Sequence, residues 1–274
     1  MSAPILPPIP NADIVRRVHL AESRYTASRL GVLARLPNNP VGIEIRDLED
    51  GGLAMQARFI PNMHFNRVAG LTDASKVGVL TAWYRDRGIT GHFDVVPGFT
   101  PEAVIAELWA YNFSHVSFHA TLFARPASAP PSAPGVTVEL VDATTLEEFL
   151  DCHCRGWEIP NLEGFKANTR GWLTEPGWRL YLARYYDRPA GTAILFQDGN
   201  TAYCADSACD PELRGHGVHA ALLARRLEDA GALGCDLVCA MAAYLSTSHR
   251  NMIRAGFSLL HTKSVWAERA EVRR

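Results

Sequence analysis

The spacing of apolar residues in the first half of the chain alternates between helical and strand-like periods. Ile14, Val18, Ala21 and Tyr25 form a stripe at helical spacing, and Asp13 can cap the start of that helix. Runs in which apolar and polar residues alternate are typical of half-buried strands. This half is therefore predicted to contain helices over 14–36, 75–87 and 100–112, and strands over 41–48, 53–59, 92–96 and 116–124.

The second half shows the same two periods in a different order. Thr144 and Thr145 ahead of Glu147 resemble a capping box, and Gly234 and Gly256 stand where helical patterns stop. The predicted strands are 136–141, 179–186, 190–196, 201–209, 235–242 and 257–266. One predicted helix begins at Thr144, and a further short helix leads to Trp172. Two more run from Val218 to Gly234 and over 246–255.

A segment rich in proline and alanine, ARPASAPPSAPG, separates the two halves. Such a composition offers no apolar face for a core and is typical of a semi-rigid linker. We therefore expect an N-terminal domain over 1–125, a linker over 126–135 and a second domain over 136–274.

Composition and charge exclude several classes of protein. The chain has 274 residues, of which 47% are hydrophobic and 20% charged, as in globular proteins, and its net charge of −2 does not favour nucleic acid as a partner. No apolar run reaches the roughly 18 residues of a membrane span. The proline-rich start, MSAPILPPIPNAD, lacks the features of a secretory signal and is expected to be a flexible leader. These features indicate a cytoplasmic protein that acts on no membrane.

Six cysteines all lie in the second half, at positions 152, 154, 204, 209, 235 and 239. A chain of this length does not need a disulfide framework, so most are expected to be buried thiols. The triplet Cys152-His153-Cys154 has the wrong spacing for a zinc knuckle and no matching pair follows it, so we expect no metal site.

The stretch from Thr201 to Leu227 combines a strand, a sharp turn and a helix. The start of a helix leaves backbone N–H groups without internal partners, and these groups and the helix dipole favour an anion. Glycines allow a phosphate to approach the backbone closely, and Arg214 adds a positive charge. The turn therefore suits a diphosphate, or it is an ordinary basic loop. It matches neither G-x-x-x-x-G-K-[ST] nor G-x-G-x-x-G.

Two segments resemble the GNAT superfamily of N-acetyltransferases. Arg214 and Gly217 match its coenzyme A motif, Arg/Gln-x-x-Gly-x-Gly/Ala, although His219 stands at the last position, and SHRNMIRAGF resembles the closing helix and Gly-Phe. The order of predicted elements over 136–266 is also that of the superfamily. The stretches FNRVAGL and YRDRGI resemble the degenerate first half of tandem members. The resemblance implies an α+β fold with two GNAT-like domains, each a mixed sheet flanked by helices.

The resemblance also implies acetyl transfer from acetyl-CoA, as a co-substrate, to an amine. No coenzyme motif is visible in the first half, so the coenzyme is expected in the second. The strand before the loop would pair with pantetheine and the loop would bind the diphosphate. Carried over residue by residue, the coenzyme-binding positions are Ser207, Ala208, Cys209, Arg214, Gly215, His216, Gly217, Val218 and His219.

Catalytic residues are less clearly marked than the coenzyme loop. Asp206 lies eight residues before Arg214, near where some superfamily members place a catalytic carboxylate, but it can equally face solvent. Glu158, in the loop after Trp157, is the second candidate for the general base. The position of the usual general acid, a tyrosine, holds Met252, which leaves Ser248 or water to protonate the thiolate. Cys209 as an acyl-carrying nucleophile is a minor alternative.

Two functions from different classes agree with these residues. The first is an N-acetyltransferase that acts on a small-molecule or protein amine. The second is a non-catalytic acyl-CoA sensor or interaction module, which the missing tyrosine suggests. The tandem arrangement is compatible with a monomer or a homodimer.

Overall fold

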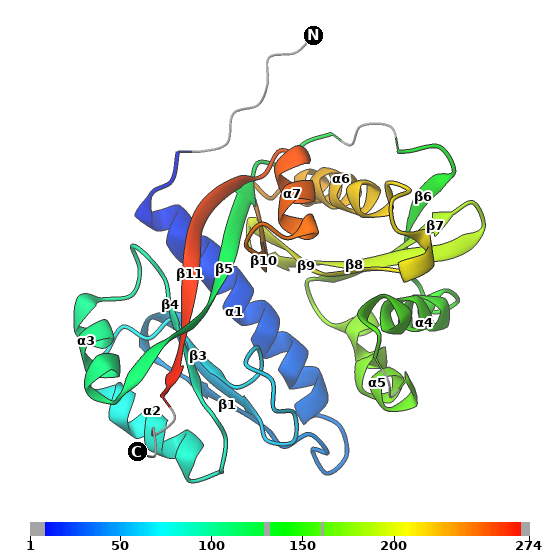
Figure 1. Cartoon of the computed structure of the whole chain (residues 1–274). Helices are drawn as coiled ribbons and strands as arrows, with labels where there is room; N and C mark the ends of the chain where they lie inside the picture. Colours follow the sequence, from blue (N-terminus) through cyan, green and yellow to red (C-terminus); the bar gives the residue numbers. More distant parts are fainter. Residues whose placement is uncertain (1–8, 129–131, 160–161, 270–274) are drawn as a thin grey trace. The chain divides into compact units, whose positions relative to one another are not determined.

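The structure, a computed structural model, describes residues 9–128, 132–159 and 162–269, which form two compact units (Figure 1). Pro10–Thr121 and the chain from Leu260 onward make up the N-terminal unit, and Leu122–Leu259 belong to the C-terminal unit. Most of the last strand thus counts with the N-terminal unit. Residues 1–8 of the expected leader and residues 129–131 of the linker lie outside the described residues.

The N-terminal unit is a mixed sheet with three α-helices, in the strand order β1-β2-β3-β4-β11-β5. β1, β2 and β3 are antiparallel neighbours, β3 and β4 are parallel, and β11 runs antiparallel to β4, with Trp266 opposite Phe93. The elements are α1 (Ala12–Ala34), β1 (Ile43–Asp47), η1 (Glu49–Gly51), β2 (Leu53–Ala57), β3 (Arg67–Ala69), α2 (Lys76–Arg85), β4 (His92–Val95), α3 (Glu102–Ala110), β5 (Phe113–Ala124) and β11 (Ser258–Glu268).

A cluster of four charged side chains is buried inside this unit. Lys263 of β11 lies 2.7 Å from Glu22 of α1 and 3.0 Å from Asp94 of β4, measured from Nζ to the carboxylate oxygens. Arg67 of β3 binds the same two carboxylates at 3.0 and 3.1 Å. None of the four side chains is more than 4% exposed. Each buried charge is therefore balanced by opposite charges, which is the condition for burying it at tolerable cost.

The C-terminal unit holds strands in the order β10-β9-β8-β7-β6, with β10 parallel to β9 and the other neighbours antiparallel. In Figure 1, α4 and α5 cover one face of these strands and α6 and α7 the other. The elements are β6 (Val136–Leu140), α4 (Leu146–Trp157), α5 (Leu162–Thr169), η2 (Arg170–Thr174), β7 (Trp178–Tyr185), β8 (Arg188–Asp198), β9 (Thr201–Cys209), η3 (Pro211–Leu213), α6 (Val218–Ala232), β10 (Leu237–Ala243) and α7 (Thr247–Arg254).

Most predicted elements are confirmed, but two predicted helix caps are wrong. Asn11, not Asp13, caps α1, because its side chain lies one position before the helix and accepts the amide of Ile14 at 2.9 Å. At α4 the side chain of Thr145 caps nothing within the helix, and the carboxylate of Asp142 accepts the amides of Thr144 and Thr145. The short strand β3 has no counterpart among the predicted elements.

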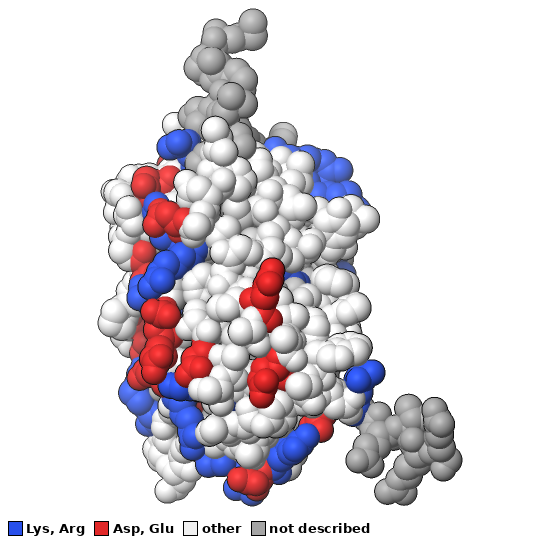
Figure 2. All heavy atoms as spheres, turned by 90° about the vertical axis from the view of Figure 1, so that its left-hand side faces the viewer, with Lys and Arg blue, Asp and Glu red and all other residues white. Residues whose placement is uncertain are grey.

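Acidic and basic side chains lie beside one another on the face shown in Figure 2, with broad areas of uncharged residues between them. This distribution agrees with the near-neutral net charge. None of the helices in the described ranges is long and apolar enough to cross a membrane.

Candidate functional site

The predicted site begins where β9 changes its pairing. On one edge, β9 pairs with β10 from Thr201 to Cys204, and the register stops there. On the other edge, the pairing with β8 shifts between Thr192 and Ile194, so that Asp206 and Ser207 form a bulge. The φ angle of Asp206 is +36°, in the left-handed region. Ala208 and Cys209 therefore keep their pairing with β8, while the register with β10 does not extend past Cys204, so the other edge of β9 is open to a strand-like ligand in the described residues.

Arg226 of α6 lies behind this bulge and is fully buried. Its guanidinium donates to the carbonyl oxygens of Ile194 and Ala205 at 3.1 and 3.2 Å and to the hydroxyl of Ser207 at 2.8 Å. A buried carbonyl without a partner is costly. Arg226 therefore satisfies backbone groups of β8 and β9 at the bulge.

Two glycines bring helices onto the strands on either side of the site. A Cβ atom on Gly156 of α4 would lie 2.7 Å from the Cβ of Ala208 and 3.1 Å from the amide nitrogen of Cys209. A Cβ atom on Gly191 of β8 would lie 2.6 Å from Val218 at the start of α6. Both contacts need glycine, because real Cβ atoms do not approach so closely. They set the distances between β9, α4 and the loop.

The loop between β9 and α6 is held at its first residue. The carboxylate of Asp210 accepts the amide of Glu212 at 3.1 Å and binds Nε of Arg155 at 2.9 Å, which ties the loop to α4. Gly215 and Gly217 have φ angles of +86° and +82°. Gly217 is the N-cap of α6 and supplies no side-chain cap. The first N–H groups of α6, including those of Val218 and His219, are therefore available to an anion.

The charged side chains at the loop are exposed. Nη2 of Arg214 lies 3.9 Å from Oε1 of Glu158, with the two side chains 56% and 73% exposed. Glu158 ends α4 in the left-handed region, which places it beside the coenzyme loop. The imidazole of His216 stacks on Tyr185, with ring centroids 4.3 Å apart. The side chain of His216 is thus engaged by a neighbouring strand.

His219 links the start of α6 to α7. Its Nδ1 atom lies 3.3 Å from Nδ2, the side-chain amide nitrogen, of Asn251. Burial, together with the charge of Arg226, lowers the pKa of His219 to about 4. The ring is therefore neutral at physiological pH, and because Nδ1 accepts from Asn251, its proton is assigned to Nε2. The residue that departs from the motif thus connects two helices.

The buried face of α7 consists of Met252 and His249. Ser246 caps the helix, and Nδ1 of His249 accepts the amide of Leu245 at 3.0 Å. Because Nδ1 accepts this bond, the ring proton is assigned to Nε2, and this buried atom has no hydrogen-bond partner among the described residues. Ser248 is half-buried on the same helix. His249 is a hydrogen-bond donor that the sequence prediction did not select.

The cysteines near the site are protonated thiols. Burial raises the pKa of Cys209 to about 11 and that of Cys152 to about 12, despite nearby arginines. A thiol is a poor nucleophile until it is deprotonated. These values argue against Cys209 as an acyl-carrying residue.

His153, the centre of the Cys-His-Cys triplet, is a core residue. It is 1% exposed, its Nδ1 lies 2.9 Å from the hydroxyl of Thr192, and its ring stacks on Phe149 and Phe165. In the part of the chain that the structure describes, no three His, Cys, Asp or Glu side chains are grouped to hold a metal ion.

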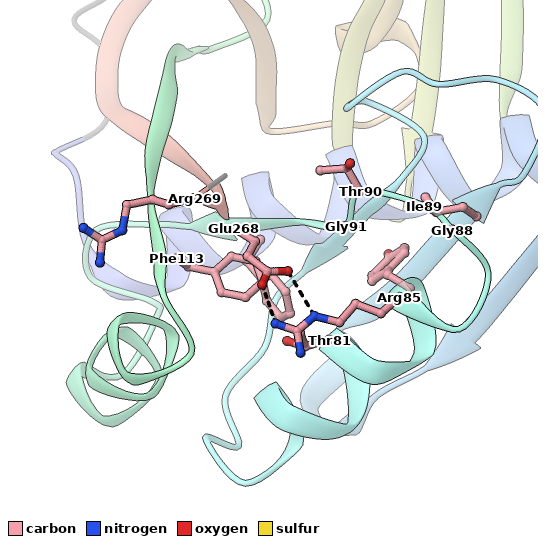
Figure 3. Close-up of a pocket in the computed structure, with 11 residues that line it drawn as sticks. Thr81, Arg85, Gly88, Ile89, Thr90, Gly91, Phe113, Glu268 and Arg269 are labelled. Atoms are coloured by element: carbon pink, nitrogen blue, oxygen red, sulfur yellow. Dashed lines mark hydrogen bonds and ion pairs between the residues drawn. The ribbon is translucent and has the colours of Figure 1, made fainter. Parts of the chain in front are cut away.

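A pocket of about 550 Å³ lies in the N-terminal unit, and none of the predicted site residues lines it (Figure 3). Tyr84, Phe93 and Phe113 line this pocket, and so do Arg85 of α2 and Glu268 of β11, which form an ion pair. Its lining includes both threonines 81 and 90 and Arg269. The pocket is therefore separate from the candidate site.

All twelve predicted site residues lie in the C-terminal unit. The run from Asp206 to His219 is continuous along β9, the loop and the first turn of α6, Glu158 approaches it through Arg214, and Ser248 lies on the helix to which His219 is bonded. Sequence reasoning missed Arg226 and Asn251. Nothing in the local pattern marks Arg226, which falls at a helical position on the buried face of α6.

Part of the chain matches a known protein family. Residues 133–244 match the family model described as an acetyltransferase (GNAT) domain, a range that includes β9, the loop and α6. No curated protein matches the chain.

Solved structures share the fold of nearly the whole chain. A tandem GNAT protein from the clavulanic acid biosynthesis pathway is 17% identical, with 96% of this chain and 97% of that chain covered and a TM-score of 0.61. A GCN5-related N-acetyltransferase from Kribbella flavida is 15% identical, with 91% and 96% covered and a TM-score of 0.61. One from Sphaerobacter thermophilus is also 15% identical, with 97% and 96% covered and a TM-score of 0.59. At these identities the likeness concerns the fold.

Proposed function

Because residues 133–244 match the family model of an acetyltransferase (GNAT) domain, we propose that this chain transfers an acetyl group from acetyl-CoA to an amine of a small molecule or a protein. The observation that carries the proposal is the combination of an open β9 edge with a helix start that has no side-chain cap. These two features follow one another along the chain at the predicted coenzyme residues. Both lie within the matched family domain.

The coenzyme would be held mainly by backbone groups. The open edge of Ser207 to Cys209 offers donors and acceptors to the amides of pantetheine, as in the addition of a strand to a sheet. The N–H groups from Gly215 to His219 and the guanidinium of Arg214 would bind the diphosphate. This arrangement explains why a histidine is tolerated at position 219, because its side chain is directed to Asn251.

In the proposed reaction the amine nitrogen attacks the thioester carbon, a C–N bond forms and the C–S bond breaks. The ammonium substrate gives its protons to a base, and the departing thiolate receives one from a general acid or water. Holding the two reactants in line supplies a large part of the acceleration. The protein therefore needs few chemically active side chains.

Asp206 and Glu158 remain the two candidates for the base, and their different positions allow a direct comparison. Asp206 lies in the bulge, whereas Glu158 is next to Arg214. If Asp206 is the base, Asp206→Asn will abolish the acidic limb of the pH–rate profile. Glu158→Gln will instead leave that limb intact and tighten coenzyme A binding, because it removes a negative charge beside Arg214. The reverse pattern would assign the base to Glu158.

The proposed function is tested by calorimetric titration with acetyl-CoA followed by thiol release across a panel of amines. We expect binding that coenzyme A competes for, and turnover with at least one amine. Failure to bind acetyl-CoA would contradict the assignment of the coenzyme loop.

A second function is favoured by Met252, whose thioether occupies the buried face of α7 where a proton-donating tyrosine is usual. The chain would then bind acyl-CoA as a sensor without transferring the acyl group. Tight binding of acetyl-CoA without turnover on any amine would support this function over the first. Turnover that is lost in Ser248→Ala or His249→Gln would instead identify the group that replaces the tyrosine.

A further inference from the structure

Arg226 is a buried cation held only by neutral oxygen atoms. Its side chain is fully buried, and its four hydrogen bonds go to the carbonyls of Leu222, Ile194 and Ala205 and to the hydroxyl of Ser207. Among the residues that the structure describes, no carboxylate forms an ion pair with it. The buried cations of the N-terminal unit differ, because Arg67 and Lys263 each bind two carboxylates.

A buried charge without a counter-ion is costly, since hydrogen bonds to neutral groups replace only part of its hydration. Such a charge creates a positive potential in a region from which water is excluded, where its effect is weakly screened. The potential of Arg226 reaches both ends of the predicted coenzyme site. Its charge opposes the burial that raises the pKa of Cys209 on β9, and it adds to the burial that lowers the pKa of His219 on α6.

The bonds of Arg226 also fix the part of β9 that departs from regular strand geometry. Ile194 and Ala205 are register partners at one end of the bulge, and Ser207 lies within it. Asp206, between the last two, has a left-handed backbone that a non-glycine residue adopts only at some cost. Binding residues on both sides of Asp206 holds that conformation in place.

We propose that Arg226 is a positioning residue for acyl transfer, which holds the β9 bulge in shape and polarises its peptide groups toward the thioester carbonyl. This inference rests on the proposed function of the site. When Arg226 donates to the carbonyl of Ala205, it draws electron density through the peptide group that joins Ala205 to Asp206 and so strengthens the dipole of that group at the bulge. Negative charge that develops on the thioester oxygen is then stabilised by an arrangement already in place.

The test measures the carbonyl stretch of bound acetyl-CoA labelled with ¹³C at the acetyl carbonyl, which requires no knowledge of the amine. In the wild-type protein we expect the band to move to lower frequency on binding, because a polarised carbonyl has a weaker bond. In Arg226→Met the shift should be clearly smaller, with an affinity for coenzyme A within about threefold of wild type, a change below 1 kcal/mol. With an active amine, kcat should fall by ~10²-fold while KM for acetyl-CoA changes little.

The matched control is Arg225→Met, the same substitution on the adjacent residue of α6. The side chain of Arg225 is 31% exposed and binds Asp229 and the carbonyl of Val138, away from the bulge. Arg226→Lys is a second variant that keeps a buried cation with fewer donors, and it should recover part of the band shift if methionine impairs folding.

The outcomes separate this inference from the function on which it rests. A wild-type protein that does not bind acetyl-CoA overturns the proposed function. A protein that binds it, but shows the full band shift in Arg226→Met, overturns the role of Arg226 alone. The same conclusion follows if Arg225→Met reduces the shift as much as Arg226→Met does.

Discussion

Arg214 is the single side chain at the coenzyme loop whose charge is both exposed and close to an acidic neighbour. Its guanidinium is 56% exposed and 3.9 Å from Glu158. An exposed pair at this distance contributes little to stability, so Arg214 can exchange its partner for a phosphate at small cost. Its contribution should therefore appear in coenzyme binding and hardly in folding.

We expect Arg214→Ala to weaken coenzyme A binding by about tenfold, since a hydrogen bond to a charged group contributes about 1.5–3 kcal/mol and exposure reduces it. Binding of pantetheine, which lacks the diphosphate, should be unchanged. The measurement is calorimetric titration with both ligands. Arg188→Ala is the control, because Arg188 is 65% exposed and pairs with Glu212 near the loop. If Arg214→Ala weakened the binding of coenzyme A and of pantetheine equally, Arg214 would not bind the diphosphate.

Residue identities in the site were predictable only where a short motif or composition marks them. Arg214 and Gly217 follow from the local order of basic and glycine residues at a helix start. Arg226 does not, because its partners Ile194 and Ala205 are 32 and 21 residues away and are brought to it by strand register. The bond between His219 and Asn251 likewise depends on the packing of two helices.

At the scale of elements, the contact of α4 with β9 depends on Gly156. A helical glycine normally weakens its helix by about 1 kcal/mol relative to alanine. Here a Cβ atom would meet the backbone of Cys209 at 3.1 Å as well as the side chain of Ala208. Backbone atoms in a sheet cannot move aside independently, so packing outweighs helix propensity.

Gly156→Ala should lower the free energy of unfolding by about 1–3 kcal/mol, the usual cost of overpacking, and should weaken acetyl-CoA binding by displacing Ala208. Urea denaturation and calorimetry measure the two effects. Gly31→Ala in α1 is the matched control. The nearest atom to its added Cβ is the flexible end of Arg35 at 3.4 Å, so it should stabilise the protein by up to about 1 kcal/mol. A stabilised Gly156→Ala protein would contradict the packing argument.

The elements themselves were largely predictable from periodicity. The strand over 201–209 and the helix from Val218 coincide with β9 and α6. The bulge at Asp206 was not predictable, because a period of two cannot show where the register with β8 shifts. β3 is only three residues long and is too short to produce a recognisable alternation.

At the scale of the whole molecule, several histidines and a buried carboxyl of the N-terminal unit have lowered pKa values. Burial is the largest cause that lowers the pKa of His19 and His261 to about 4, and it also lowers that of His119. The carboxyl of Glu22 differs, since burial alone would raise its pKa but Lys263 and Arg67 hold it below its usual range. Acid therefore affects these groups in two successive ranges.

His19 and His261 are neutral in the folded state down to about pH 4 but take up protons in the unfolded state below about pH 6.5, so stability decreases as the pH falls through this interval. The contribution of Glu22 is lost at lower pH, below about 4.5, where the unfolded carboxyl protonates. For His19, which is 3% exposed, lowering the pKa from 6.5 to about 4 corresponds to a decrease of about 3 kcal/mol in the free energy of unfolding at low pH.

We therefore expect His19→Leu to raise the thermal midpoint at pH 5 relative to wild type, with a smaller effect at pH 8. Both ring nitrogens of His19 are buried without hydrogen-bond partners among the described residues, so an apolar side chain of similar size loses no bond. Thermal unfolding at the two pH values is the measurement. If the thermal midpoint of His19→Leu differed between pH 5 and pH 8 as much as that of wild type, the result would contradict this explanation.

The ion pair between Lys263 and Asp94 also has a consequence for biosynthesis. These residues are 169 positions apart, so at a translation rate of 5–20 residues per second Lys263 is added roughly 8–34 s after Asp94. During that interval the carboxylates of Glu22 and Asp94 have only Arg67 as a buried counter-charge. The N-terminal unit therefore lacks β11 and one of the two cations that bind Glu22 and Asp94 until Lys263 has been added.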